Sequence, residues 1–188
     1  MIWRVVMERL MILPPESYVD NNKIPRLVEF VEEFMKQDVS NFWVDIGEKN
    51  VGTSINWKSI IVNPYDIDEY WSQNRELEDR AKHIIDYVKT MKGVERFAIN
   101  VLFKASLIPI HVDDDKRPEY DFTSRCYNIL IPIYDHGYSI VDYKLIKNKT
   151  GVPLVFDGQI PHGGMNDTLE TRITLFLNVN KEAFDVSA

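Results

Sequence analysis

The sequence predicts an α+β fold in which helices come first and a sandwich or small barrel of short strands follows, with the helices packed on one side. Two observations lead to this prediction. Before Gly93 apolar residues recur at helical spacing, and after Gly93 the chain consists of short β-branched and aromatic segments separated by turn residues. The 188 residues suit a single domain, with residues 1–93 as the helix-rich part and residues 94–182 as the strand-rich core.

Two segments of the first half are expected to be helical. Within residues 24–37 apolar side chains fall on one face and charged side chains on the other, and Pro25 suits the first helical turn. Residues 66–92 are expected to form one long helix or two, ended by Gly93. Residues 41–63 alternate loosely between apolar and polar, and they are expected to contain short strands.

The second half is expected to supply the strands of the core. The apolar, strand-like stretches are residues 94–112, 123–134, 138–146, 151–156 and 171–180. Turn residues separate them, and these are Asp114-Asp115, Asp135-His136-Gly137, Asn148-Lys149-Thr150-Gly151 and Gly163-Gly164.

Composition and charge argue against several classes of protein. The formal net charge of −7 disfavours binding to a phosphate backbone, so nucleic acid is not an expected partner. The single cysteine, Cys126, excludes an internal disulfide framework and a cysteine zinc cluster. Residues 1–18 are too short and too charged for a membrane span and lack a signal-peptide core, so a cytoplasmic protein without membrane contact is expected. The sequence does not indicate an oligomeric state.

Two of the four histidines stand beside acidic or turn residues that suit a metal site. His111 and Asp113 are two apart, so on a strand both side chains point to one face. His162 follows 51 residues later, just past a short apolar strand. Two imidazoles and one carboxylate leave about half of an octahedron open, which is typical of non-haem Fe(II) sites. Zinc accepts the same ligands. The other two histidines, His83 in a helix and His136 in a turn, are expected to be structural.

A basic residue on the last apolar strand adds an anion-binding feature. Arg172 lies ten residues after His162, and Thr174 shares its strand face. A buried arginine needs an anionic partner, which a bound dicarboxylate would provide. Each of these features alone is more common in a structural role, whereas their combination on strands of one barrel predicts a functional site.

These residues resemble the Fe(II)/2-oxoglutarate-dependent oxygenase superfamily. The resemblance depends on His111-Val112-Asp113, His162 and Arg172 in the context "PHGGMNDTLETRITL", and it covers roughly residues 95–180. It implies a double-stranded β-helix, also called a jelly roll and similar to the cupins, with Fe(II) at its mouth. It also implies 2-oxoglutarate as cosubstrate, its far carboxylate held by Arg172 and Thr174, and O2 as oxidant.

Two groups within this superfamily are the most similar. The stretches "SRCYNILIPI" and "LVFDGQIPHGGMND" resemble the aspartyl/asparaginyl β-hydroxylase group, which implies that Arg125 and Tyr127 also line the pocket. Asn100, on an earlier strand, is a further polar candidate. That group often lacks the carboxylate ligand, whereas Asp113 is present here. The prolyl-hydroxylase-like group shares the His-x-Asp pattern and the ten-residue spacing, but usually has lysine where Arg172 stands.

The resemblance implies a dioxygenase that hydroxylates an unactivated C–H bond, with succinate and CO2 as co-products. Its substrate would be a small molecule or an amino-acid or peptide side chain. One alternative is a non-catalytic, cupin-like module that binds a metal or a small molecule. Another is a metal-dependent isomerase or hydrolase, which would need a general base and would leave Arg172 without a role.

Overall fold

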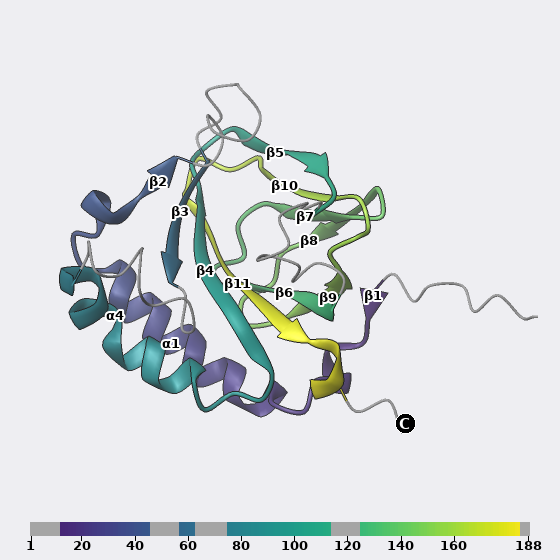
Figure 1. Ribbon diagram of the computed structural model, residues 1–188. Coiled ribbons are helices and arrows are strands. Elements are labelled where there is room, and N and C mark those ends of the chain that lie inside the picture. Colours follow the sequence, from purple (N-terminus) through teal and green to yellow (C-terminus); the bar gives the residue numbers. More distant parts are fainter. Residues whose placement is uncertain (1–11, 46–56, 63–74, 114–124, 185–188) are drawn as a thin grey trace, which may run out of the picture.

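The computed structural model describes residues 12–45, 57–62, 75–113 and 125–184, and within these ranges the strands form two antiparallel sheets (Figure 1). The larger sheet has, in order, β1 (Ile12–Leu13), β9 (Leu154–Asp157), β6 (Cys126–Pro132), β11 (Arg172–Asn180), β4 (Val94–Leu102), β3 (Trp57–Val62) and β2 (Val44–Asp45). The smaller sheet has, in order, β5 (Ser106–His111), β10 (His162–Asn166), β7 (Tyr138–Val141) and β8 (Lys144–Lys147).

From β4 onward the chain passes back and forth between the two sheets. Strands β4, β6, β9 and β11 belong to the larger sheet, while β5, the β7–β8 hairpin and β10 belong to the smaller one. In each sheet a late strand lies between two early ones, because β11 separates β4 from β6 and β10 separates β5 from β7. This eight-stranded arrangement is a jelly roll, so the predicted double-stranded β-helix is confirmed.

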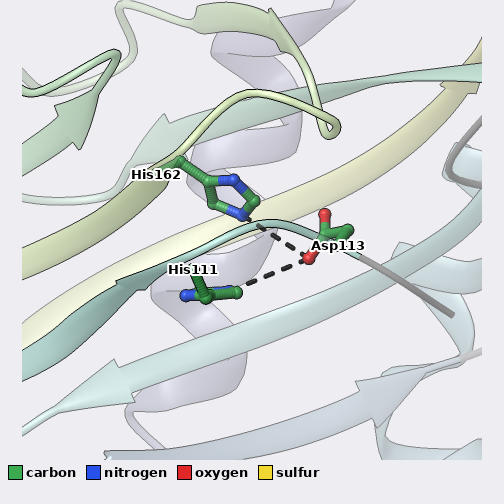
Figure 2. Close-up of side chains that lie close together, drawn as sticks. All are labelled: His111, Asp113 and His162. Carbon is green, nitrogen blue, oxygen red and sulfur yellow. Dashed lines mark ion pairs between the residues drawn. The ribbon is translucent and has the colours of Figure 1, made fainter.

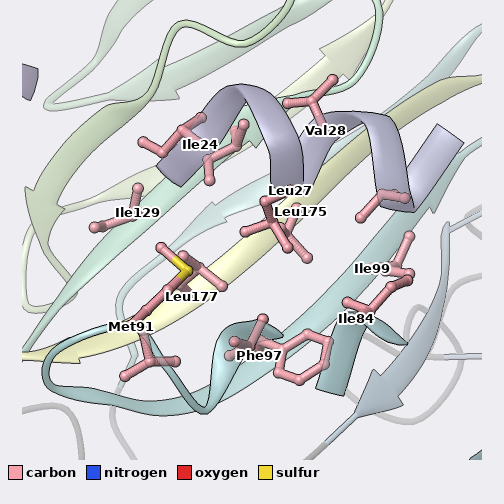
Figure 3. Packing of buried hydrophobic residues seen from close by; sticks show 14 of the residues in the cluster. Ile24, Leu27, Val28, Ile84, Met91, Phe97, Ile99, Ile129, Leu175 and Leu177 are labelled. Atoms are coloured by element: carbon pink, nitrogen blue, oxygen red, sulfur yellow. The ribbon is translucent and has the colours of Figure 1, made fainter. Parts of the chain in front are cut away.

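Within the described ranges, two helices cover the outer face of the larger sheet (Figure 1). They are α1 (Ile24–Met35) and α4 (Arg75–Val88), and short 3-10 turns lie at Pro15–Ser17, Asn21–Lys23, Ser40–Phe42 and Lys181–Ala183. Figure 3 shows side chains of both helices, among them Leu27 and Ile84, in the main apolar cluster, to which Leu175 and Leu177 of β11 also belong. The helix predicted at residues 24–37 is therefore confirmed.

The second predicted helix is described in part and ends earlier than expected. Residues 63–74 lie outside the described ranges, and α4 ends at Val88 rather than at Gly93. Gly93 instead adopts a φ of +73° directly before β4, in the left-handed region that glycine tolerates best. The strands expected within residues 41–63 are β2 and β3, which extend the larger sheet beside β4.

The two faces of the larger sheet have different chemistry. On β11 the side chains of Ile173, Leu175 and Leu177 join the apolar cluster beneath the helices. The alternate positions Arg172 and Asn178 hydrogen-bond to groups between the two sheets. Because successive strand residues point to opposite faces, the helix side is apolar and the inner side contains buried polar groups.

One predicted turn is wrong. Gly163 and Gly164 lie inside strand β10 and are not a turn. A Cβ at Gly163 would lie 2.7 Å from the backbone oxygen of Ile108 in β5, so this position needs glycine for close strand packing. The turns predicted around Gly137 and Gly151 are confirmed, and Asp114-Asp115 lies outside the described residues.

Within the described ranges, none of the helices is both long enough and apolar enough to cross a membrane.

Candidate metal centre

Three predicted ligands converge where β5 and β10 pair. His111 ends β5, His162 begins β10, and the two are direct partners in the register. Asp113 follows β5 by two residues. Its Oδ1 lies 3.8 Å from His111 Nε2 and 3.5 Å from His162 Nε2 (Figure 2). One ligand atom from each residue lies within 4.8 Å of the others.

Backbone carbonyls orient both imidazoles in the same way. His111 Nδ1 lies 2.8 Å from the oxygen of Pro109, and His162 Nδ1 lies 2.8 Å from the oxygen of Ile160. Since a carbonyl only accepts, each Nδ1 donates a proton to it, which leaves each Nε2 as the free nitrogen. Metal-binding histidines are commonly held in this tautomer by a hydrogen bond from their other nitrogen.

The electrostatics of the cluster favour a bound cation. Burial lowers the pKa of His111, and it would also lower that of His162, but the hydrogen bond and charge of Asp113 outweigh burial and raise the His162 pKa. Burial would raise the pKa of Asp113, yet His162, Asn128 and His111 together hold it below its usual value. An ionised carboxylate and two ring nitrogens therefore face one another. A bound metal ion would take the place of the proton that Asp113 favours on His162, and it would also neutralise the Asp113 charge.

The donor set suits the metal that the resemblance implies. Two imidazoles and a carboxylate bind Fe(II) on one side and leave the other positions open, and they would also bind zinc. His162 is 5% exposed and the Phe156 ring packs against it at a centroid distance of 5.0 Å. The ring of Trp57 lies 6.2 Å from that of His111, so aromatic groups flank both histidines.

Arg172 is a buried cation that has no anionic partner among the residues that the structure describes. Its side chain is 2% exposed, and its Nη2 donates to Ser139 Oγ at 3.1 Å. Its buried Nε has no hydrogen-bond partner, and no ion pair to Arg172 forms within the part of the chain that the structure describes. Burial lowers the pKa of Arg172 to about 10, so the guanidinium is still charged at neutral pH. This arrangement calls for a bound anion.

The Arg172 guanidinium packs against strand β10, which begins with His162. A Cβ at Gly164 would lie 3.1 Å from Arg172 Nη1, so the guanidinium packs directly on this part of β10. Gly164 is two residues from His162, which corresponds to about 7 Å along a strand. A dicarboxylate could therefore reach from the metal to the guanidinium.

Two further predicted residues face the same inner side. Thr174 is 1% exposed and pairs with Asn100 of β4 in the register. Asn100 Oδ1 accepts a hydrogen bond from Ser59 Oγ. Both side chains project between the sheets, on the face that contains Arg172.

The structure does not bring Arg125 and Tyr127 to this site. Arg125 is exposed, and its Nη2 donates to Glu95 at 2.8 Å. Tyr127 belongs to the helix-side cluster and packs against Phe184 with ring centroids 4.8 Å apart. The prediction that these residues line the pocket is corrected, because Tyr127 and Ile129 share the face that is turned toward the helices.

The remaining histidines keep structural surroundings. His83 of α4 makes an edge contact with Phe30, with ring centroids 5.2 Å apart. His136 Nδ1 lies 2.9 Å from the oxygen of Thr171.

Three buried polar residues near the site were not identified from the sequence. Asn128 and Asn178 lie between the sheets beside Asp113, and Ser139 accepts from Arg172. Asn178 was detectable in principle, because it has the same strand parity as Arg172 in an otherwise apolar segment. Asn128 and Ser139 gave no comparable indication.

No protein-family model and no curated protein matches this chain. Among solved structures, a prolyl-4-hydroxylase from Pseudomonas putida is 15% identical with a TM-score of 0.50, and the alignment covers 87% of this chain and 89% of that one. A viral collagen prolyl hydroxylase from Paramecium bursaria Chlorella virus-1, in a 2OG complex, is 14% identical with a TM-score of 0.47 over 87% and 92% of the chains. The plu4264 protein from Photorhabdus luminescens is 11% identical with a TM-score of 0.36, over 47% of this chain and 64% of that one, which is less than two thirds of its length.

The likeness to the Pseudomonas putida enzyme extends over nearly the whole of both chains, and at 15% identity it shows the fold alone. The strand order described above independently has the jelly-roll topology. The chain therefore has the double-stranded β-helix fold that its resemblance to the Fe(II)/2-oxoglutarate-dependent oxygenase superfamily implies.

Proposed function

We propose that this protein is an Fe(II)- and 2-oxoglutarate-dependent dioxygenase that hydroxylates a C–H bond of a small molecule or of an amino-acid or peptide side chain. The observation that supports this most strongly is the pairing of two sites on β10. His162 belongs to the candidate metal centre, and Gly164 borders the buried guanidinium of Arg172, which has no ion-pair partner within the described ranges. A module that only binds a metal ion would not need a buried cation near its metal ligands.

Each residue of the candidate site has a role in this proposal. His111, Asp113 and His162 hold one side of the metal. Arg172 binds the far carboxylate of 2-oxoglutarate through bidentate hydrogen bonds, with Thr174 as an additional hydroxyl donor. When bound, Fe(II), 2-oxoglutarate and O2 supply the oxidation of the substrate, with release of succinate and CO2.

Aromatic and apolar groups flank the metal ligands, and burial keeps water away from Arg172, which is 2% exposed. Trp57 and Phe156 flank the two imidazoles, and the apolar residues Leu102 and Ile108 pack with Trp57. Exclusion of water strengthens the interaction between the Arg172 guanidinium and a carboxylate, since the local dielectric constant is low. The cosubstrate carboxylate in turn supplies the counter-charge that this guanidinium lacks.

The test is a succinate-formation assay with protein loaded anaerobically with Fe(II). The screen should include proline-containing peptides, free amino acids, small metabolites and nucleosides, and it begins with peptides because the neighbour of similar fold is named a prolyl-4-hydroxylase. Turnover that requires both Fe(II) and 2-oxoglutarate supports the proposal. If the protein binds iron but forms no succinate, neither with a candidate substrate nor by decarboxylating 2-oxoglutarate without one, the non-catalytic, cupin-like module is favoured.

The metal ligands are tested with His111→Ala and Asp113→Ala. Each substitution removes one ligand, so both iron binding and succinate formation should be lost. His83→Ala is the matched control, because it removes a histidine that packs against Phe30 on the helix side. Normal iron affinity in both ligand variants would refute the assignment of the metal centre.

A further inference from the structure

Two buried asparagines connect the metal ligand Asp113 to the larger sheet. Asn128 of β6 and Asn178 of β11 face each other in the register and are 2% and 7% exposed. Asn178 Nδ2 donates to Asn128 Oδ1 at 2.8 Å, and Asn128 Nδ2 donates to Asp113 Oδ2 at 2.7 Å. The three side chains therefore form one hydrogen-bonded chain.

The direction of this chain is determined by the Asp113 carboxylate, which when ionised can only accept a hydrogen bond. An asparagine amide can present either its oxygen or its nitrogen to a neighbour. Because Asp113 needs a donor, the nitrogen of Asn128 faces it, and the oxygen of Asn128 is left to accept from Asn178. A buried amide that lost this arrangement would leave polar atoms unsatisfied, which is costly.

The two oxygens of Asp113 consequently have different surroundings. Oδ2 accepts from Asn128, whereas Oδ1 faces the Nε2 atoms of His111 and His162. The backbone also orients this carboxylate, since the N–H of Asp113 donates to the oxygen of Gly158 at 3.0 Å. A Cβ at Gly158 would lie 2.9 Å from Asp113 Oδ2 and 3.0 Å from Asn128 Nδ2, so glycine leaves room for this contact.

From this geometry we infer that Asn128 and Asn178 are positioning residues that make Asp113 a ligand through one oxygen only. The inference rests on the metal centre of the proposed function. A carboxylate can bind a metal through one or both oxygens, and the second mode occupies an additional coordination position. By holding Oδ2 away from the metal, the two asparagines keep that position free for the cosubstrate, oxygen or water.

The experiment compares Asn128→Leu and Asn178→Leu with the wild-type protein in the absence of turnover. Co²⁺ and Fe²⁺ affinities are measured by titration, together with the visible absorption of bound Co²⁺, which weakens as the coordination number rises. Asn128→Leu should weaken metal binding by about 10–100-fold and change the Co²⁺ spectrum. Asn178→Leu, which does not touch Asp113, should change both in the same direction by less.

Asn180→Leu is the matched control. Asn180 lies on the same strand and face as Asn178, but its amide donates to Glu95 at 3.0 Å. Its loss should lower thermal stability and leave metal affinity and spectrum unchanged.

The outcomes separate this inference from the proposed function. Unchanged affinity and spectrum in folded Asn128→Leu and Asn178→Leu proteins would overturn the positioning role while the metal centre stands. If Asn128→Leu does not fold, unchanged metal affinity and an unchanged Co²⁺ spectrum in Asn178→Leu alone would also overturn the positioning role. A wild-type protein that binds neither metal would overturn both.

Discussion

At the scale of single residues, Arg172 is the most informative side chain of the molecule. It is one of the largest fully buried side chains, and no carboxylate in the described ranges neutralises it. Keeping a charge away from water without a partner is unfavourable for the ligand-free fold. Such a residue is explained more readily by what it binds than by what it stabilises, because functional sites often lower stability.

The substitution Arg172→Leu should separate the effect of this residue on folding stability from its effect on ligand binding. Without ligand its free energy of unfolding should equal or exceed that of the wild type, by up to about 4 kcal/mol, because a buried unpaired charge is removed. The wild type should gain about 2.7 kcal/mol from 2-oxoglutarate at one hundred times its Kd, and the variant should gain nothing. Urea unfolding with and without 2-oxoglutarate, in the presence of metal, measures both quantities.

Arg125→Leu is the control for this prediction, because Arg125 is exposed and pairs with Glu95. It should retain the full response to 2-oxoglutarate. If Arg172→Leu also retained that response, the dicarboxylate would have to be bound by other residues.

At the scale of elements, strand β10 joins the two halves of the site. It begins with His162 of the candidate metal centre, and two positions later Gly164 has no side chain, where the Arg172 guanidinium packs. Ser139 of β7 pairs with Gly164 in the register. Its hydroxyl accepts a hydrogen bond from the same guanidinium and donates one to Asn148 Oδ1 at 2.9 Å. The spacing between the candidate metal centre and the guanidinium is therefore set by one strand, β10.

Gly164→Ala tests this arrangement. The added methyl group would lie 3.1 Å from Nη1 and 3.3 Å from Cζ of Arg172, so the guanidinium has to shift. Because small displacements of a binding group are costly, the affinity for 2-oxoglutarate should fall by about tenfold or more, with metal affinity unchanged. Parallel titrations of metal and of 2-oxoglutarate measure the two effects.

The double variant Gly164→Ala/Arg172→Leu shows whether the methyl group acts through the arginine. It should bind 2-oxoglutarate no more weakly than Arg172→Leu alone, because the group that the methyl displaces is already absent. Additive losses would mean that Gly164 contributes to binding independently.

The strand β6 shows which part of the site could be predicted from sequence and which could not. The period of two placed His111 with Asp113 and Arg172 with Thr174, since each pair is a local relation. The same rule could not say which face of β6 is inside, because helices cover one face and the smaller sheet the other, and both are buried. Tyr127 was therefore assigned to the wrong face, and Asn128, its neighbour on the inner face, was missed.

At the scale of the whole molecule, the larger sheet divides the interior into two parts with different roles. The helix side holds the main apolar cluster, whereas the inner side has a small cluster formed by Leu130, Val141, Phe156 and Ile160 beside the buried polar groups. The helices therefore stabilise the sheet by packing on its outer face, and the candidate site lies on its inner face. Sequence periodicity predicted the helices and short strands within residues 41–63. It did not predict that β3 joins the larger sheet beside Asn100 of β4.

This division predicts different consequences for two equivalent substitutions. Phe34 of α1 and Phe156 of β9 are both fully buried, but only Phe156 contacts His162, with ring centroids 5.0 Å apart. Phe34→Leu and Phe156→Leu should each lower the free energy of unfolding by about 1–3 kcal/mol. Only Phe156→Leu should weaken metal binding, because the ring that packs against the imidazole is lost.

The comparison requires that both variants be folded, so metal titrations are made well below the midpoint of thermal unfolding. Each protein then serves as the stability control for the other. Equal metal affinities in the two variants would mean that the packing of His162 does not depend on Phe156. A loss of affinity in Phe34→Leu would mean that the helix layer and the metal centre are energetically coupled across the sheet, since independent sites add their effects without interaction.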